Sequence, residues 1–116
     1  SELQKYQKAY WDGEYPKAVE MFLLLTPDHQ ENDNYRFTYA NALLQSGKTN
    51  QAISIFESII KNNRSKYVAE AYFGLAMGQL RKENTVQANE LLTKYVKLEK
   101  ARKKEQANEI IHKLKE

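Results

Sequence analysis

Cysteine is absent from this 116-residue sequence, which excludes disulfide bonds, thiolate metal sites and a cysteine nucleophile. Long apolar runs are also absent, since the longest is the short Met21–Leu25 stretch, far below the roughly 18 residues that a bilayer-spanning helix needs. We therefore expect no membrane insertion. Only two prolines occur, and 41% of the residues are hydrophobic. A chain of this length is long enough for one domain with a modest core and too short for two.

Catalytic motifs are missing as well. The sequence has no Gly-rich phosphate loop, no paired carboxylates in an expected apolar cleft and no nucleophile beside a base. Of the two histidines, His29 lies in an expected polar linker, and His112 follows Glu109 by three residues on a charged helix, a spacing typical of a surface pair. We predict that the protein is not an enzyme and that it holds no cofactor or metal.

Acidic residues are scarce in the second half of the chain. Residues 1–60 carry 5 Lys/Arg against 8 Asp/Glu, a net charge of −3, whereas residues 61–116 carry 13 against 7, a net charge of +6. Such a gradient can steer an acidic partner toward the C-terminal half. The most basic run holds six cations against Glu99 alone: Lys94, Lys97, Lys100, Arg102, Lys103 and Lys104.

This basic run has three interpretations. It is a solvated helix end, a dock for an acidic protein or membrane surface, or a nucleic-acid site. Nucleic-acid binding is the least favoured, because it usually combines a basic face with stacking aromatics, and here the aromatic residues belong to a different pattern.

That pattern is an internal repeat. A turn residue, a small residue and a large apolar residue recur after 34 residues and again after a further 36, the two extra residues lying in the connection at 62–66. The three sets are Gly13, Ala18 and Phe22; Gly47, Ala52 and Phe56; and Glu83, Ala88 and Leu92. A small residue followed one turn later by a large one lets two helices approach and then fills the space between them.

Helix signals fall where the repeat requires them. Gly47 can take the left-handed conformation that ends a helix, Pro16 suits a first helical turn, and polar residues can cap the helices that follow the turns. These cap candidates are Thr49 or Asn50, and Asn84 or Thr85. The expected helices cover residues 2–11, 14–25, 32–46, 50–62, 66–81 and 85–98.

The last segment has a different pattern. Ala107, Ile110, Ile111 and Leu114 form an i, i+3, i+4, i+7 apolar stripe on an otherwise charged helix. A stack of repeats exposes apolar surface at its open end, and a terminal helix with one polar face covers that surface. We therefore expect a capping helix at about 101–115.

The period and the small-then-large spacing resemble the tetratricopeptide repeat (TPR) family, although Glu83 replaces a turn glycine. The resemblance implies an all-α fold, a right-handed TPR solenoid of three helix-turn-helix repeats plus a C-terminal capping helix. The repeats would cover about 1–30, 33–64 and 66–99 of a single domain, 1–116. The pattern also resembles the C-terminal TPR domains of bacterial envelope-associated proteins, which would place the chain on the cytoplasmic or periplasmic side of the envelope, alone or within a larger protein.

In TPR proteins the first helix of each repeat lines a concave groove, so the resemblance implies a protein-protein interaction module, a scaffold or adaptor that holds a protein or peptide partner. The groove residues it implies are Tyr10, Trp11, Phe37, Asn41, Leu44, Phe73, Met77 and Arg81. The alternative for Phe37 and Phe73 is packing against neighbouring helices, and for Trp11 a staple on the first turn. A receptor for chaperone tails is not expected, because only Asn41 fits the carboxylate-binding positions.

Two features leave alternatives open. Gly74 and Gly78 each cost about 1 kcal/mol relative to alanine inside a helix. They therefore indicate close approach of another backbone, either that of a neighbouring helix or that of a ligand lying in the groove. Tyr6, Tyr10 and Trp11 near the N-terminal end could instead meet a second copy of the chain or further repeats, which makes self-association the main alternative to peptide binding.

Overall fold

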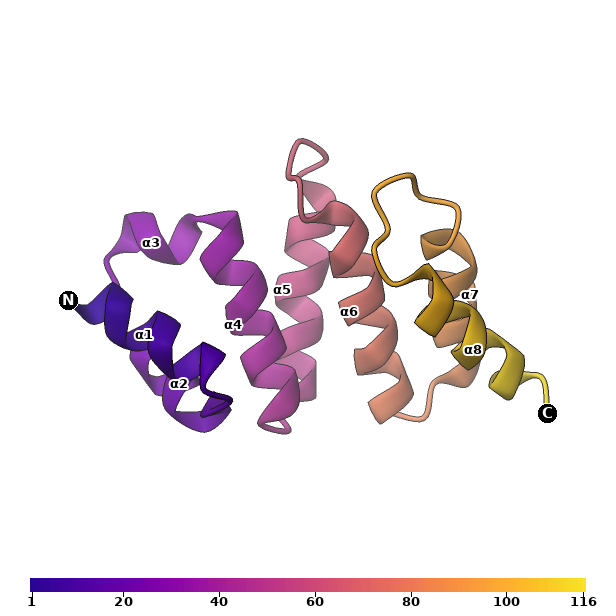
Figure 1. Cartoon of the computed structure of the whole chain (residues 1–116), viewed down its shortest axis with the longest axis horizontal. Helices are drawn as coiled ribbons and strands as arrows, with labels where there is room; N and C mark the ends of the chain where they lie inside the picture. Colours follow the sequence, from indigo (N-terminus) through magenta and orange to yellow (C-terminus); the bar gives the residue numbers. More distant parts are fainter.

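Eight helices and no strands make up the chain, all of whose residues, 1–116, the computed structural model describes (Figure 1). The helices are α1 (Glu2–Trp11), α2 (Tyr15–Phe22), α3 (Pro27–Glu31), α4 (Asp33–Gln45), α5 (Thr49–Lys61), α6 (Val68–Arg81), α7 (Thr85–Tyr95) and α8 (Lys104–Leu114). The expectation of an all-α fold is confirmed.

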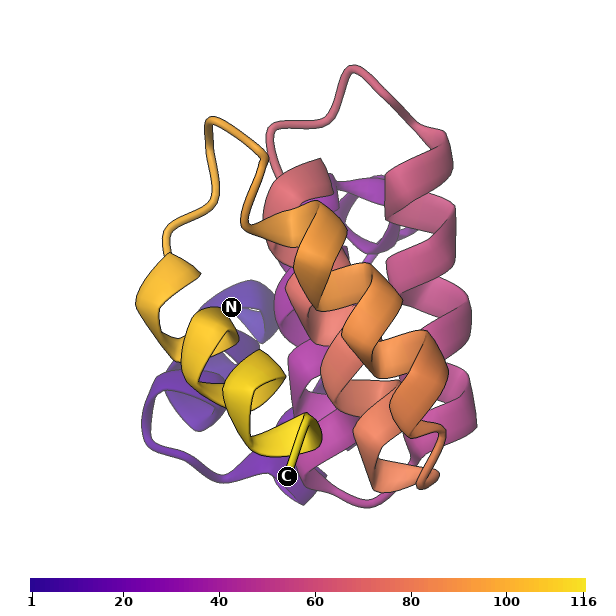
Figure 2. The ribbon, with the colours of Figure 1, turned by 90° about the vertical axis from the view of Figure 1, so that its right-hand side faces the viewer.

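The helices form a row in chain order. Apart from the short α3, which packs on α4, each helix packs mainly on the helix before it and the helix after it, so the molecule measures 47 × 28 × 21 Å and its termini lie at opposite ends (Figure 1). Seen along the row, α5 and α8 lie on opposite sides (Figure 2). The connections 62–67 and 96–103 project from the same edge in both views.

The three turn positions of the repeat share one backbone conformation. Gly13 has φ +77° and Gly47 has φ +80°, in the left-handed region that the sequence predicted for Gly47. Glu83 has φ +63°, so the third turn has the same conformation without glycine, at a cost of about 1–2 kcal/mol. Pro16 lies in the first turn of α2, as expected.

Two helices are shorter than predicted, and one was missed. α2 ends at Phe22 rather than near residue 25, and α7 ends at Tyr95 rather than near 98. Residues 27–31, expected as a polar linker, form α3, whose N-cap Thr26 accepts a hydrogen bond from the backbone N–H of His29 (3.3 Å). The side chain of Gln30 then donates to three carbonyls at the end of α2, those of residues 22, 23 and 25. These contacts end α2 early.

Of the expected helix caps, only Asn84 occupies an N-cap position, and no side chain caps α5 or α7. The N-cap of α5 is Lys48, with no side-chain hydrogen bond to the helix, so neither Thr49 nor Asn50 caps it. Asn84 is the N-cap of α7, but its side chain donates to Gln79 Oε1 (2.7 Å) across the turn instead of capping the helix. Both helices instead follow a left-handed turn residue that already reverses the chain.

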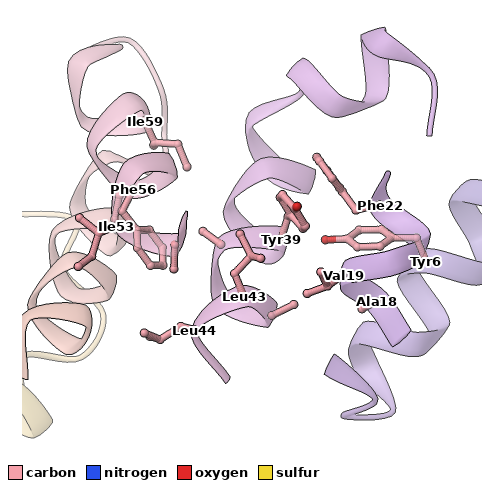
Figure 3. Packing of buried hydrophobic residues seen from close by; sticks show 14 of the residues in the cluster. Tyr6, Ala18, Val19, Phe22, Tyr39, Leu43, Leu44, Ile53, Phe56 and Ile59 are labelled. Atoms are coloured by element: carbon pink, nitrogen blue, oxygen red, sulfur yellow. The ribbon is translucent and has the colours of Figure 1, made fainter. Parts of the chain in front are cut away.

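Most of the buried core lies in the first five helices. Aromatic rings dominate it: Phe22 stacks on Tyr39 with centroids 3.8 Å apart, and Tyr6 meets Phe22 edge-on at 5.6 Å (Figure 3). The Tyr6 hydroxyl is 2.7 Å from Thr38 Oγ1, which satisfies the one polar atom of this ring. The rings therefore join α1, α2 and α4.

The small-then-large pattern packs as predicted. Ala18, Ala52 and Ala88 are fully buried, and so are Phe56 and Leu92, while Phe22 is nearly so. A buried side chain of this size contributes about 1.5–3 kcal/mol relative to an exposed one. The alanine and the large apolar residue of each repeat therefore pack the second helix of that repeat against its neighbouring helices.

The two central glycines are explained by a neighbouring helix. A Cβ at Gly74 would lie 2.4 Å from Phe56 Cζ, and one at Gly78 would lie 2.7 Å from Ile53 Cγ1, both on α5. Of the two alternatives left open by the sequence, the neighbouring helix is confirmed, although its side chains rather than its backbone make the approach.

A smaller core cluster lies at the C-terminal end. Four residues are buried there, Ala76, Leu92, Tyr95 and Ala107. The stripe residues Ile110, Ile111 and Leu114 pack half-buried against them, so the apolar face of α8 is directed at α6 and α7. None of the eight helices combines the length and apolar character needed to cross a bilayer.

Candidate functional site

A hollow lies where α4 and α6 run side by side. It has a volume of about 220 Å³, and residues from α1, α2, α4, α6 and the connection before α8 line it. The lining residues are Tyr10, Tyr15, Phe37, Asn41, Leu44, Gln45, Glu70, Phe73, Gly74, Met77 and Lys103. Phe37, Asn41 and Leu44 share one helix face because they are spaced by four and three residues.

Six of the eight expected groove residues line this hollow, and two do not. Trp11 is outside it, with 77% of its surface exposed and its ring edge-on to Tyr10 at 5.1 Å. Arg81 is also outside, at the end of α6, where its guanidinium donates to Gln45 Oε1 (3.3 Å). The residues that the resemblance implied are therefore brought together except for Trp11 and Arg81, each of which is the last residue of its helix.

The aromatic residues of the hollow also support the core. Phe37 stacks on Tyr67 (5.3 Å, 23°) and meets Phe56 edge-on at 6.0 Å. Phe73 is tilted against Tyr95 at 5.3 Å. Both rings are half-buried, so each packs on a neighbouring helix and still presents a surface to the hollow. Leu44 is only 3% exposed, so it contributes little surface to the hollow.

Asn41 and Tyr10 join α4 to α1 within the hollow. The Asn41 side-chain amide donates to the Tyr10 hydroxyl (3.2 Å). Burial raises the pKa of Tyr10, which keeps the phenol neutral and hydrogen-bonded. The side-chain NH₂ group of Asn41 is thus engaged within the fold, whereas its side-chain oxygen accepts no hydrogen bond within the chain.

A second, larger hollow continues from the first, because Phe37 and Glu70 line both. It has a volume of about 510 Å³, and its remaining lining residues are Lys66, Tyr67, Lys100 and Arg102. We use the name basic pocket for these six residues. The sequence showed the basic run at 94–104 but not its proximity to Lys66, because Lys66 and Lys100 are 34 residues apart in the chain.

Glu70 holds the basic connection in place. The Tyr95 hydroxyl donates to the Glu70 carboxylate (2.9 Å to either oxygen), and the backbone N–H of Arg102 donates to Oε2 (2.9 Å). The backbone N–H of Lys103 then donates to the Tyr95 hydroxyl (2.8 Å). Burial raises the pKa of Tyr95 to about 12. This Glu70–Tyr95 network fixes the 96–103 connection against α6.

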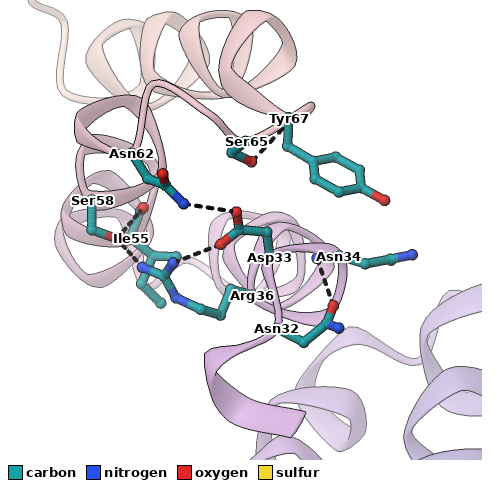
Figure 4. A network of polar contacts seen from close by, with 9 residues as sticks. All are labelled: Asn32, Asp33, Asn34, Arg36, Ile55, Ser58, Asn62, Ser65 and Tyr67. Carbon is teal, nitrogen blue, oxygen red and sulfur yellow. Dashed lines mark hydrogen bonds and ion pairs between the residues drawn. The ribbon is translucent and has the colours of Figure 1, made fainter. Parts of the chain in front are cut away.

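A third hollow, of about 590 Å³, lies beside the start of α4 (Figure 4). Two of its lining residues, Asp33 and Asn62, belong to a polar network (Figure 4). Arg36 pairs with Asp33 (3.1 Å) and donates to Ser58, and Asn62 donates to the other oxygen of Asp33 (3.2 Å). This network joins α4 to α5. The side chains of Glu31, Arg64 and Lys66, which also line the hollow, make no hydrogen bond or ion pair within the chain.

The two histidines lie apart from these hollows. His29, in α3, meets Tyr35 edge-on at 5.7 Å, and His112 is exposed, with Glu116 rather than Glu109 as its nearest acidic partner (4.0 Å). No three His, Cys, Asp or Glu side chains come together in an arrangement that could hold a metal ion.

Comparison with known proteins finds no protein-family model that matches the chain and no curated protein that is similar to it. The geometry of the two connected hollows is therefore what bears on function.

Proposed function

We propose that the chain is a TPR-type protein-interaction module that holds a segment of a partner protein in the groove formed by the two connected hollows. The observation that carries this proposal is the groove itself. Three successive first helices, α1, α4 and α6, each contribute an aromatic side chain to it, and these rings remain partly accessible. Aromatic surfaces with a few polar groups are typical of peptide-binding grooves.

The repeat geometry supports the TPR interpretation. The turns at Gly13, Gly47 and Glu83 share a left-handed conformation, and each separates two packed helices. The alanine of each repeat is fully buried. A right-handed solenoid of three such units with α8 as its cap would present α1, α4 and α6 on its concave side.

A direct test places a photo-crosslinking amino acid at one of two matched positions. Gln45 and Gln51 are both exposed glutamines only a few residues apart, but Gln45 lines the groove whereas Gln51 lies on α5 and lines none of the hollows described above. Peptides selected from a random library on the intact chain should crosslink from position 45 and not from position 51. Equal crosslinking from both positions, or selection of no peptide, would contradict the proposal.

Self-association through the ends of the row is the second candidate. Large apolar side chains are exposed at the N-terminal end, with Trp11 at 77%, Leu23 at 63% and Leu24 at 66%, and at the other end Val86 is 68% exposed. Apolar side chains exposed at the open ends of a stack of helices can contact a second copy or further repeats. A mass that rises with concentration in light scattering, and that Leu23→Ser with Leu24→Ser abolishes, would favour this candidate.

A further inference from the structure

Building on the proposed function, we propose that the partner segment is an acidic peptide whose carboxylates occupy the basic pocket while a neighbouring apolar side chain lies on Phe37. Three cations converge on this pocket, its one carboxylate is already hydrogen-bonded, and the lining residues at the far end of the groove are uncharged.

Three cations converge on the pocket from two distant connections. Lys66 comes from the 62–67 connection, and Lys100 and Arg102 come from the 96–103 connection, which projects from the same edge of the row (Figures 1 and 2). All three side chains are exposed, and none of them takes part in an ion pair or a hydrogen bond within the chain. Their positive charge is thus available to a ligand.

The only acid in the pocket is already engaged. The Glu70 carboxylate accepts hydrogen bonds from the Tyr95 hydroxyl and from the backbone N–H of Arg102. These bonds use the main chain at Arg102, so its guanidinium stays free. The pocket therefore keeps an excess of positive charge, and the connection that carries two of the three cations is fixed before any ligand arrives.

An aromatic wall lies beside the cations. Phe37 stacks on Tyr67, and Lys66 Nζ lies 5.6 Å from the centre of the Tyr67 ring. At the boundary between the two hollows, Lys103 Nζ lies 5.0 Å above Phe73. A ligand that combines carboxylates with an apolar side chain can use both surfaces at once.

The charge is confined to one end of the groove. Beyond Lys103 the lining residues Asn41, Gln45 and Met77 carry no charge, and residues 1–60 as a whole have a net charge of −3. A nucleic-acid strand needs cations along its whole path, because each of its units carries a phosphate. A peptide with acidic residues at one end and apolar or neutral residues at the other matches this distribution better.

The experiment uses the intact chain and peptides selected from a random library, with a thymidine oligonucleotide as the nucleic-acid probe. We expect selected peptides to be enriched in Asp and Glu next to an apolar residue, and to bind more weakly as salt rises. Lys100→Gln with Arg102→Gln should weaken their binding by roughly 2- to 30-fold. The control, Lys82→Gln with Lys113→Gln, also removes two exposed positive charges and should leave binding unchanged.

The outcomes separate this inference from the proposed function. Peptides that crosslink from position 45 but show no acidic enrichment, or that bind the Lys100/Arg102 variant normally, overturn the acidic inference and leave the groove function standing. Failure to select any groove-binding peptide defeats both. Oligonucleotide binding that displaces the peptides assigns the pocket to nucleic acid, and a dimer that the Lys100/Arg102 variant disrupts assigns it to a second copy. Either result overturns the inference.

Discussion

The two ends of the row are held together by different means. In α1 to α5 and the adjoining face of α6, seventeen buried residues interlock around stacked rings, and a tyrosine hydroxyl is satisfied by neutral groups. Around α6 to α8 the second core cluster holds only four buried residues. A carboxylate, a phenol and two backbone amides form the hydrogen bonds that hold the 96–103 connection there. The N-terminal region is therefore a packed core, whereas the C-terminal region depends on a polar network that also presents the basic pocket.

The largest expected effects come from a matched pair of leucines. Leu43 and Leu92 are both fully buried, one in each cluster. Truncation of either to alanine should lower the free energy of unfolding by about 2–5 kcal/mol. The two variants should differ in which regions exchange their amide hydrogens faster. Leu92→Ala should raise exchange mainly in α7, α8 and the 96–103 connection, whereas Leu43→Ala should raise it across α1 to α5. The same exchange pattern for both variants would show that the regions unfold as one unit.

A matched pair of tyrosines tests the polar network next. Tyr95→Phe removes a hydroxyl bonded to a carboxylate and should cost about 1.5–3 kcal/mol of unfolding free energy, whereas Tyr6→Phe removes one bonded to neutral groups and should cost about 0.5–1.5 kcal/mol. Chemical denaturation measures both. In the Tyr95 variant the amides of Arg102 and Lys103 should also exchange faster, because their acceptors are loosened or lost. Unchanged protection there would refute the role given to Tyr95.

The junction between the two regions is tested at Gly74. Gly74→Ala places a methyl group against the Phe56 ring, and such overpacking costs roughly 1–3 kcal/mol, offset by up to about 1 kcal/mol from the better helix propensity of alanine. We expect a net loss of stability in thermal or chemical denaturation. In a double-mutant cycle with Phe56→Leu, the two changes should cost less together than the sum of the single changes. Simple additivity would mean that the contact is not strained.

Alkaline pH gives the smallest and most graded effect. Burial raises the pKa of Tyr95 to about 12 and also raises the pKa of Tyr6, against an ordinary value of 10.0. Above pH 10 the unfolded chain therefore loses these protons before the folded chain does, so stability present below pH 10 falls as the pH rises through the folded-state pKa. Denaturation midpoints measured from neutral pH upward should fall less steeply in Tyr6→Phe and in Tyr95→Phe than in the parent. If the midpoints of the variants fall with pH as steeply as those of the parent, burial of these two phenols is not the cause of the loss of stability.

The sequence was a good guide to local features. The spacing of Ala18, Ala52 and Ala88 identified three buried helix contacts, and Gly47 marked a left-handed turn, because such features depend on residues close together in the chain. It failed where distant groups decide the outcome. The early end of α2 depends on Gln30, which lies in a helix that the polar composition of 27–31 concealed.

For the candidate site, too, some residues were predicted correctly from the sequence and others were not. The resemblance to TPR repeats, with which the helical spacing agrees, predicted that Phe37, Asn41, Phe73 and Met77 share a groove, and all four line one hollow. It could not show that the helix-end residues Trp11 and Arg81 lie outside, because their positions depend on how neighbouring helices cross.

The sequence by itself determined an all-helical chain with a repeating small-then-large pattern and a basic second half. Only the tertiary structure brought Lys66 beside Lys100 and Arg102 and placed Tyr95 against Glu70. The physical reason is that helix periodicity is fixed by interactions within about four residues, whereas these contacts join groups 25 to 36 residues apart, and the packing of whole helices decides whether such groups meet.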